Sequence, residues 1–281
     1  MARTDALSIL ASSETKDKLI ELGGKLIESI QKNAVSSYIK NTDYSGDPTS
    51  GSVEINRFDN ATVDNYGTAR AAGKGKALKN SGKVTINLDQ DKEITTEIEF
   101  KDLKLFGVAG LLEKRTANHG KRAVAHLDRA FFAVAEAAGT AVTSSATEYI
   151  DIVDEMIANA ESTTNEYVDG VDREDLVLAI KPTVFNALRK YVDKYDNGVD
   201  SGEVNKIHGV EVYSNFRQDA DIVLMVKGAV AQPVAVSDYT AEKIPLAEAF
   251  AAETYLHYGT KAIMPDLIWT YGGGDESGES E

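Results

Sequence analysis

The segment Lys121–Thr140, KRAVAHLDRAFFAVAEAAGT, is the clearest helix in the sequence, and the other elements are arranged around it. Its apolar side chains recur at intervals of three and four residues, which places them on one face of a helix. They are Val124, Leu127, Phe131, Val134 and Ala138. Many remaining positions are alanine, the strongest helix former, and Gly139 followed by Thr140 provides a stop. About 20 helical residues span about 30 Å, so we expect a rod that crosses a whole domain and lies on a sheet.

The start of this rod is open. The preceding segment keeps helical spacing at Leu105, Val108 and Leu112, but three glycines weaken the pattern. They are Gly107, Gly110 and Gly120. The sequence therefore allows one rod that begins near Phe106, or a shorter rod that begins at Lys121.

Composition excludes several classes of protein. The 281 residues contain no cysteine, which removes disulfides, thiolate metal sites and a cysteine nucleophile. No apolar run approaches 18 residues, so we expect no transmembrane helix. The N-terminus lacks the basic start and apolar centre of a signal peptide. The net charge of −15 repels phosphates, so the bulk surface is not expected to bind nucleic acid.

The first fifty residues form an arm in our interpretation. Glu14–Lys32 has the apolar stripe of a short helix, interrupted by Gly23-Gly24, and Asn41–Gly51 is a turn-rich loop. A helix with an apolar stripe on a flexible connection is expected to dock on another apolar surface. Its partner is either the core of its own chain or a neighbouring subunit.

A β-hairpin is predicted after the arm. Residues 52–58 alternate as a short strand. Val84, Ile86 and Leu88 alternate, a turn follows at residues 89–92, and a second alternating run ends at Phe100. That second run contains Ile94, Thr96 and Ile98. A two-stranded hairpin is marginal in water, so its apolar face must pack on something else.

The segment Arg70–Lys83, RAAGKGKALKNSGK, is the only strongly basic stretch. Its cations are Arg70, Lys74, Lys76, Lys79 and Lys83, and it contains no acid. The glycine spacing does not fit a phosphate-binding P-loop. We expect a loop tip that meets an acidic neighbouring surface, with a merely solvated loop as the alternative.

The second half of the chain alternates between helices and strands. Pro182 sits where a missing N–H is tolerated at a helix start, and the last residues, 272–281, form an acidic tail that we expect to be disordered. Helices are expected at residues 149–160 and 183–191, a loop at 195–202, and strands at 176–180, 207–212, 221–226 and 230–236, with 250–258 as either and a final strand around Trp269.

No set of residues forms an active site, so we expect no catalytic residue, no cofactor and no metal. His119 and His126 are seven residues apart, about 10 Å along a helix, which is too far for one metal ion. Two acidic clusters do not follow the calcium-loop spacing. They comprise Asp169, Asp172, Glu174 and Asp175, and then Asp193, Asp196, Asp200 and Glu203.

Four local patterns, in this order, resemble the major capsid proteins of tailed bacteriophages, which have the Hong Kong 97-type fold. They are HLDRA at 126–130, LVLAIKPTVFNAL at 176–188, IHGVEV at 207–212, and Tyr258-Gly259 followed by AIMP at 262–265. The resemblance covers residues 51–271. It implies an α+β fold with an N-terminal arm, an extended β-hairpin loop, a long spine helix, and peripheral and axial domains.

The resemblance also assigns the parts of the chain. They are an arm at 1–50, an extended loop at 51–102, a spine helix at 103–141, an axial domain at 142–235, a return to the peripheral domain at 236–271, and the tail at 272–281. The loop would contact a neighbouring subunit. Its contact residues would be Arg70, Lys74, Lys76, Lys79, Lys83, Val84, Ile86, Leu88, Ile94, Ile98 and Phe100.

The function implied is a non-enzymatic subunit of an icosahedral shell that encloses double-stranded DNA. Expected partners are further copies in hexamers and pentamers, a separate scaffolding protein, a portal, a decoration protein, and packaged DNA without specific recognition, but no membrane. The protein would be made in the host bacterial cytoplasm and reside in the virion capsid. The alternatives are an encapsulin-like compartment shell, and a metal-binding α/β enzyme that uses Asp193, Asp196 and Asp200.

Two departures from the family matter. Fifty residues are short for a built-in scaffolding domain, which favours a separate scaffold. Lys76 and Lys79 lie in the loop that carries a cross-linking lysine in some members, but no partner Asn or assisting carboxylate matches. Covalent cross-linking is therefore not expected.

Overall fold

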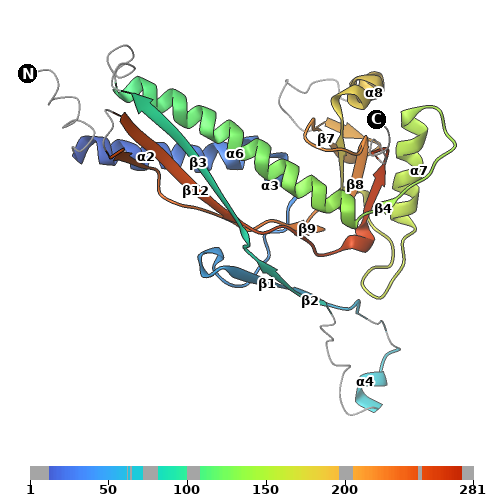
Figure 1. The fold of residues 1–281 in the computed structure, drawn as a ribbon. Helices are drawn as coiled ribbons and strands as arrows, with labels where there is room; N and C mark the ends of the chain where they lie inside the picture. Colours follow the sequence, from blue (N-terminus) through green and yellow to red (C-terminus); the bar gives the residue numbers. More distant parts are fainter. Residues whose placement is uncertain are drawn as a thin grey trace, which may run out of the picture.

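The computed structural model describes residues 13–61, 63, 65–71, 82–99, 108–195, 205–245 and 249–273. They form an elongated lobe, a compact lobe and an arm that projects away from both (Figure 1). Helix α6, Val108–Ala138, runs along the elongated lobe and ends in the compact lobe. The α+β class expected from the sequence is confirmed.

Helix α6 is one continuous rod of 31 residues. It passes through Gly110 and Gly120, so the alternative of a rod that starts only at Lys121 is wrong. Gly120 has a packing role, because a Cβ atom there would lie 3.0 Å from the Oγ atom of Ser29 on the neighbouring helix. Val124, Leu127 and Phe131 are buried, as their spacing predicts.

The elongated lobe has a helical layer and a sheet. Helix α2, Ser13–Asn33, lies beside α6, and both cover one face of a sheet in the order β10-β12-β11, with β3 also paired to β12. Gly23-Gly24 does not interrupt α2, contrary to the sequence pattern. The strands are β3 (Gln90–Glu99), β10 (Val234–Val236), β11 (Thr240–Lys243) and β12 (Ala249–Tyr258).

The predicted pairing of residues 84–88 with residues 94–100 as a hairpin is wrong. Strand β2, Gly82–Asn87, pairs antiparallel with β1, Ser52–Arg57, whereas β3 pairs along its whole length with β12. Alternation is the same whichever partner a strand takes, and residues 88–92 contain no glycine or proline to favour a tight turn. The chain therefore passes from the arm into the elongated lobe at Leu88–Asp89.

The compact lobe is a mixed six-stranded sheet between two helical layers. Both faces of its central strand β5, Leu176–Ile180, are buried. Leu176, Leu178 and Ile180 pack with α7 and α8, whereas Val177 and Ala179 pack against Phe131 and Phe132 of α6. The helices are α7 (Tyr149–Glu161) and α8 (Pro182–Tyr195), and the strand order is β4 (Thr140–Ala141), β14 (Ile268–Tyr271), β8 (Ile222–Val226), β5, β7 (Val210–Ser214) and β6 (Asn205–Ile207).

Two predicted single strands are each divided in two. His208 and Gly209 both have positive φ, 51° and 91°, the backbone of a tight hairpin turn, so residues 205–214 form β6 and β7. Residues 230–236 split into β9 (Val230–Ala231), which pairs with β13 (Lys261–Ala262), and β10. The shorter elements are α3 (Val35–Ile39), α4 (Thr68–Ala71) and 3-10 turns at Pro48–Ser50, Arg173–Asp175 and Pro265–Leu267.

A buried carboxylate joins three parts of the chain. Asp128 of α6 is 0% exposed and accepts hydrogen bonds from the backbone N–H and the hydroxyl of Ser36 at 3.0 and 2.8 Å. Arg217 donates to its other oxygen at 2.5 Å. The carboxylate therefore holds α3 and the loop after β7 against the long helix. The sequence showed Asp128 only as part of the HLDRA pattern and gave no signal of this role.

Candidate assembly surfaces

The arm is anchored at its root. The guanidinium of Arg57, at the end of β1, donates to both oxygens of Asp266 at 2.6 and 2.8 Å and lies 3.8 Å from the centre of the Tyr167 ring. Asn165 also donates to Asp266 at 2.5 Å. Burial opposes ionisation of Asp266, but the hydrogen bond and charge of Arg57 outweigh it and hold the pKa of that carboxyl below its usual value. These contacts fix the direction in which the arm leaves the compact lobe.

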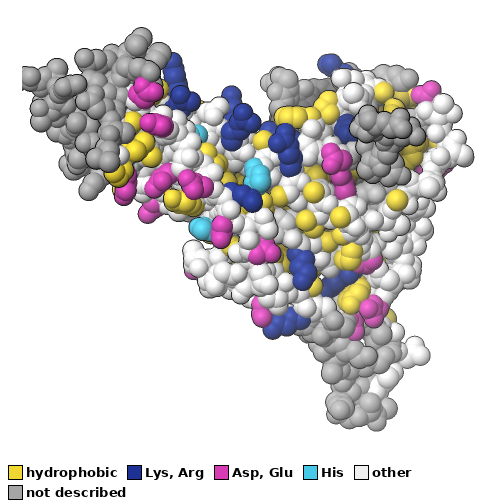
Figure 2. Space-filling view, in the orientation of Figure 1, with side chains coloured by type: hydrophobic (Ala, Val, Ile, Leu, Met, Phe, Trp, Pro, Cys, Tyr) yellow, Lys and Arg dark blue, Asp and Glu magenta, His cyan; other side chains and the backbone are white. Residues whose placement is uncertain are grey.

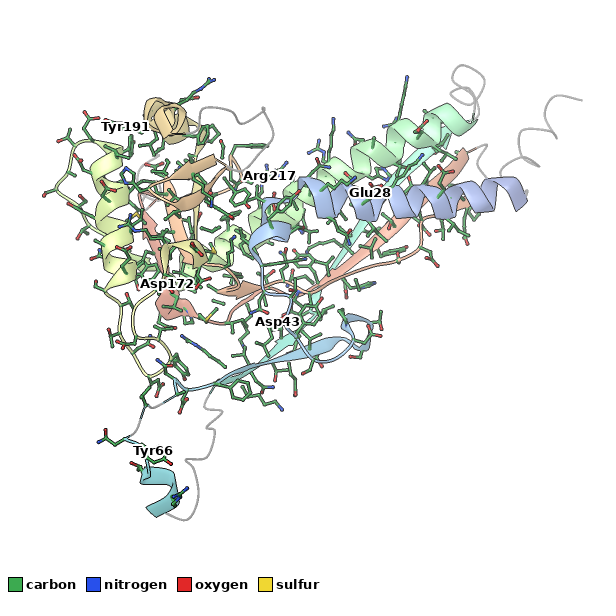
Figure 3. All side chains as sticks on the ribbon, turned by 180° about the vertical axis from the view of Figure 1, so that it is seen from behind. Glu28, Asp43, Tyr66, Asp172, Tyr191 and Arg217 are labelled. Carbon is green, nitrogen blue, oxygen red and sulfur yellow. The ribbon has the colours of Figure 1, made fainter. Side chains whose placement is uncertain are left out.

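The far part of the arm exposes apolar side chains. Val63 and Tyr66 are 100% and 98% exposed, and Phe58, next to Arg57 at the root, is also exposed. Tyr66 lies at the end that is furthest from both lobes (Figure 3). Large apolar groups that protrude beyond a subunit mark surfaces that bind other proteins. Sequence reasoning missed them, because they lie singly in a polar stretch without periodicity.

The basic contact candidates lie partly outside the described residues. Arg70 is exposed on α4, and Lys83 on β2 forms a 2.9 Å ion pair with Glu54 of β1. Lys74, Lys76 and Lys79 lie outside the described residues, as does Phe100. The two described cations are therefore on the arm, where the sequence placed them.

The apolar contact candidates pack mainly on their own chain, which corrects the expected role of two of them. Ile86 is 1% exposed in a cluster with Val53, Ile55 and Ile263, and Ile98 is 2% exposed in the core of the elongated lobe. Since they are buried in the subunit, they are not free to contact a neighbour. The other three are half-buried, namely Val84, Leu88 and Ile94.

The outer face of the elongated sheet is acidic. Side chains alternate along β3, so Ile94, Thr96 and Ile98 face the helices and the odd-numbered residues face outward. Figure 2 shows Asp and Glu side chains gathered over this part of the molecule. Five of the outward carboxylates are Asp91, Glu93, Glu97, Glu242 and Glu253. The pKa of Tyr255, on the same face, is raised chiefly by the charge of Glu253, with further contributions from Glu93 and Glu242.

Helix α2 has two apolar faces. Leu19, Leu22 and Leu26 are buried against the elongated lobe, so the arm docks on its own core as one of the two alternatives predicted. Ile20 and Ile27, seven residues apart and about a quarter turn round the helix from the buried leucines, are exposed. They form a second apolar surface that the chain itself leaves uncovered.

The histidines of the long helix are part of the packing. His119 is buried and forms hydrogen bonds with Thr96 and Tyr239, and His126 contacts the hydroxyl of Tyr258 at 2.8 Å. Among the described residues, no group of three or more His, Asp or Glu side chains is placed to hold a metal ion. Most of the second acidic cluster, which includes Asp196 and Asp200, lies outside those residues. No helix in the described ranges is long and apolar enough to span a membrane.

Comparisons with solved structures identify the fold. No family profile matches the sequence, and no curated protein matches it either. The capsid of cyanophage P-SCSP1u superposes with a TM-score of 0.59 at 16% identity, covering 87% of this chain and 89% of that chain. A structure from Mycobacterium phage Che8 gives 0.55 at 20% identity, covering 79% and 84%. The virus-like particle from Pyrococcus furiosus gives 0.59 at 10% identity, covering 89% and 97%. The chain has the Hong Kong 97-type fold of tailed-phage capsid proteins, as the order of its sequence patterns predicts.

Proposed function

We propose that this chain is the major subunit of an icosahedral shell, and specifically of the capsid of a tailed bacteriophage that packages double-stranded DNA. Many copies would assemble as hexamers and pentamers. The observation that carries the proposal is the arm: it is anchored at Arg57, projects beyond both lobes and ends in exposed apolar side chains. Contact with another copy would remove the exposed apolar side chains at the end of such an arm from water.

The parts of the chain take the following roles in this proposal. The arm, about residues 52–87, is the extended loop; this is shorter than the 51–102 expected from the sequence, because β3 belongs to the elongated sheet. Helix α6 is the spine, the elongated lobe is the peripheral domain and the compact lobe is the axial domain. The two lobes share α6, so the axis of a capsomer and its rim would be held at a fixed separation.

The acidic face of the elongated sheet is the proposed binding surface for the basic loop of a neighbouring copy. Like charges on adjacent strands repel one another, and a cationic partner relieves that repulsion. The loop between β1 and β2 carries Lys74, Lys76 and Lys79 in an acidic chain. Charge complementarity thus supports contact between one copy's loop and the next copy's sheet.

The variant Lys74→Glu/Lys76→Glu/Lys79→Glu should impair shell formation without unfolding the subunit. The side chains are proposed to meet a partner, so reversing their charge changes a contact between copies. Light scattering would follow assembly, and circular dichroism would check the fold. The control replaces exposed lysines elsewhere, Lys32→Glu/Lys206→Glu/Lys227→Glu, which shifts net charge equally. Normal shells from the loop variant would show that the loop is passive.

The remaining partners follow from the same role. The net charge of −15 suits a shell whose inner surface lies beside packaged DNA without binding it tightly. A separate scaffolding protein, a portal and a decoration protein are the other proposed partners, and the proposed location is the virion, after synthesis in the host cytoplasm. No catalytic step is assigned to the chain.

A compartment shell of the encapsulin kind is the second candidate. The likeness to the virus-like particle from Pyrococcus furiosus, with the same TM-score as the cyanophage capsid, favours keeping it. Purification of the assembled protein from its native source separates the two. A viral capsid should contain double-stranded DNA and a portal, whereas a compartment should contain an enzyme as cargo.

A further inference from the structure

A groove runs between α2 and α6 on the helical side of the elongated lobe. Its volume is about 840 Å³, and Leu22, Val124, Ala125 and Phe216 contribute apolar surface to it. Its rim is basic. The cations are Lys25, Lys121, Arg122, Arg129 and Arg217, against the single acid Glu113. At one end lies Arg217, where the two lobes meet (Figure 3).

Several cations of this rim have no acidic partner. Lys25 pairs with Glu21 and Glu113, and Arg217 pairs with Asp128. Lys121, Arg122 and Arg129 are exposed, and no carboxylate of the described residues lies within ion-pair distance of them. Figure 2 shows Lys and Arg side chains in a row along α6. In a chain with net charge −15, this row attracts a negatively charged occupant.

The concave shape favours a peptide as that occupant. Duplex DNA is a wide rod whose phosphates gain nothing from an apolar floor. An acidic chain segment can place its backbone on the floor and its carboxylates on the rim. Arginine side chains there can bind carboxylates through two parallel hydrogen bonds.

The chain carries such a segment, and the described part ends within reach of the groove. Residues 274–281, GDESGESE, hold four carboxylates and no cation. Gly273 lies against Ala220, since a Cβ atom there would be 2.5 Å from the Cα atom of Ala220. The N–H of Ala220 donates to Glu136 of α6 at 3.1 Å. The segment therefore leaves the fold beside Glu136.

Glu136 stands on the same helical row as the unpaired cations. Arg129 and Arg122 precede it by seven and fourteen residues, which keeps them on one face, about 10 and 21 Å away along the axis. Eight extended residues reach about 26–29 Å. The segment is thus long enough to pass Arg129 and end beside Arg122.

We propose that the acidic segment 274–281 docks in the groove between α2 and α6 of its own chain, with its carboxylates on Arg129, Arg122 and Lys121. It acts there as a built-in occupant that keeps polyanions out of the groove. This inference does not depend on the shell function, because every contact lies within one subunit.

The absence of cysteine allows a direct test in the full chain. Ser280→Cys/Ala125→Cys places one thiol on the segment and one in the groove. The control, Ser280→Cys/Thr183→Cys, places the second thiol on α8. Thr183 is also within reach of the segment, because Lys181 and Gly272 both contact Asp221. Disulfide formation under mild oxidation is measured on unassembled subunits by mass spectrometry and non-reducing gels.

The groove pair should form an intramolecular disulfide at least about tenfold faster than the control pair at low salt. The difference should vanish with Arg122→Gln/Arg129→Gln, and in 1 M salt, where charges are screened beyond about 3 Å. Equal rates in the two pairs would overturn the proposal. So would a groove disulfide that links two copies, since the occupant would then come from a neighbour.

Binding of a labelled acidic peptide, GDESGESE, gives an independent readout. The variant Asp275→Asn/Glu276→Gln/Glu279→Gln/Glu281→Gln should bind this peptide at least about tenfold more tightly than the parent chain. A matched variant, Asp151→Asn/Glu155→Gln/Asp169→Asn/Glu174→Gln, makes the same change in net charge away from the groove and should show little gain. Equal gains in both variants would contradict docking of the segment.

Discussion

Replacing Asp128 with Ala should lower the free energy of unfolding by about 3–5 kcal/mol, the cost of breaking a buried ion pair from one side. The carboxylate is fully buried, and its loss leaves the Arg217 guanidinium without its 2.5 Å partner. Ser36 loses the acceptor of its N–H and hydroxyl at the same time. Urea unfolding of the unassembled subunit, followed by circular dichroism, measures the change.

Two controls locate the origin of the loss. Arg115→Ala changes an exposed residue of α6 outside the groove and should stay within about 0.5 kcal/mol of the parent chain. Asp128→Leu/Arg217→Met removes both charges and should recover much of the loss, because no buried charge is left unpaired. A decrease below about 1 kcal/mol for Asp128→Ala would show that the junction contributes little to stability.

Arg57→Ala should raise the protein concentration needed for assembly by at least about tenfold, a larger effect than on the subunit itself. The arm root loses both hydrogen bonds to Asp266 and the stacking on Tyr167, worth about 1–3 kcal/mol in the subunit. Every contact that an arm makes with a neighbour depends on its direction, so in the proposed shell the loss recurs at each copy.

Static light scattering across a concentration series measures the assembly threshold. The control is Lys32→Ala, which breaks the exposed pair with Glu28 on α2 and should leave the threshold nearly unchanged, since exposed pairs contribute little. An unchanged threshold for Arg57→Ala would show that the arm needs no fixed direction.

Helix periodicity and buried runs predicted most elements of both lobes. The stripe of Val124, Leu127 and Phe131 identified α6, and the run at 176–180 identified a strand buried on both faces. These patterns show directly which residues are buried, and burial is the property that the fold requires of those positions. Glycine signals were less informative: Gly120 marks a close approach between helices, and Gly23-Gly24 lies within an unbroken α2.

Strand partners and polar junctions were not predictable. Alternation in β2 and β3 says that one face is covered, but not by which segment, so the two strands were assigned to each other when each pairs elsewhere. The contact roles of Ile86 and Ile98 failed for the same reason. Arg57 and Asp266 are more than 200 residues apart, and nothing local in the sequence links them.

Electron microscopy of the purified full chain, with size-exclusion chromatography on the same sample, tests the central claim most directly. The account predicts closed icosahedral shells, or free pentamers and hexamers at low concentration, with the arm of each copy lying on its neighbour. A chain that stays monomeric at high concentration, across salt and pH, would contradict it.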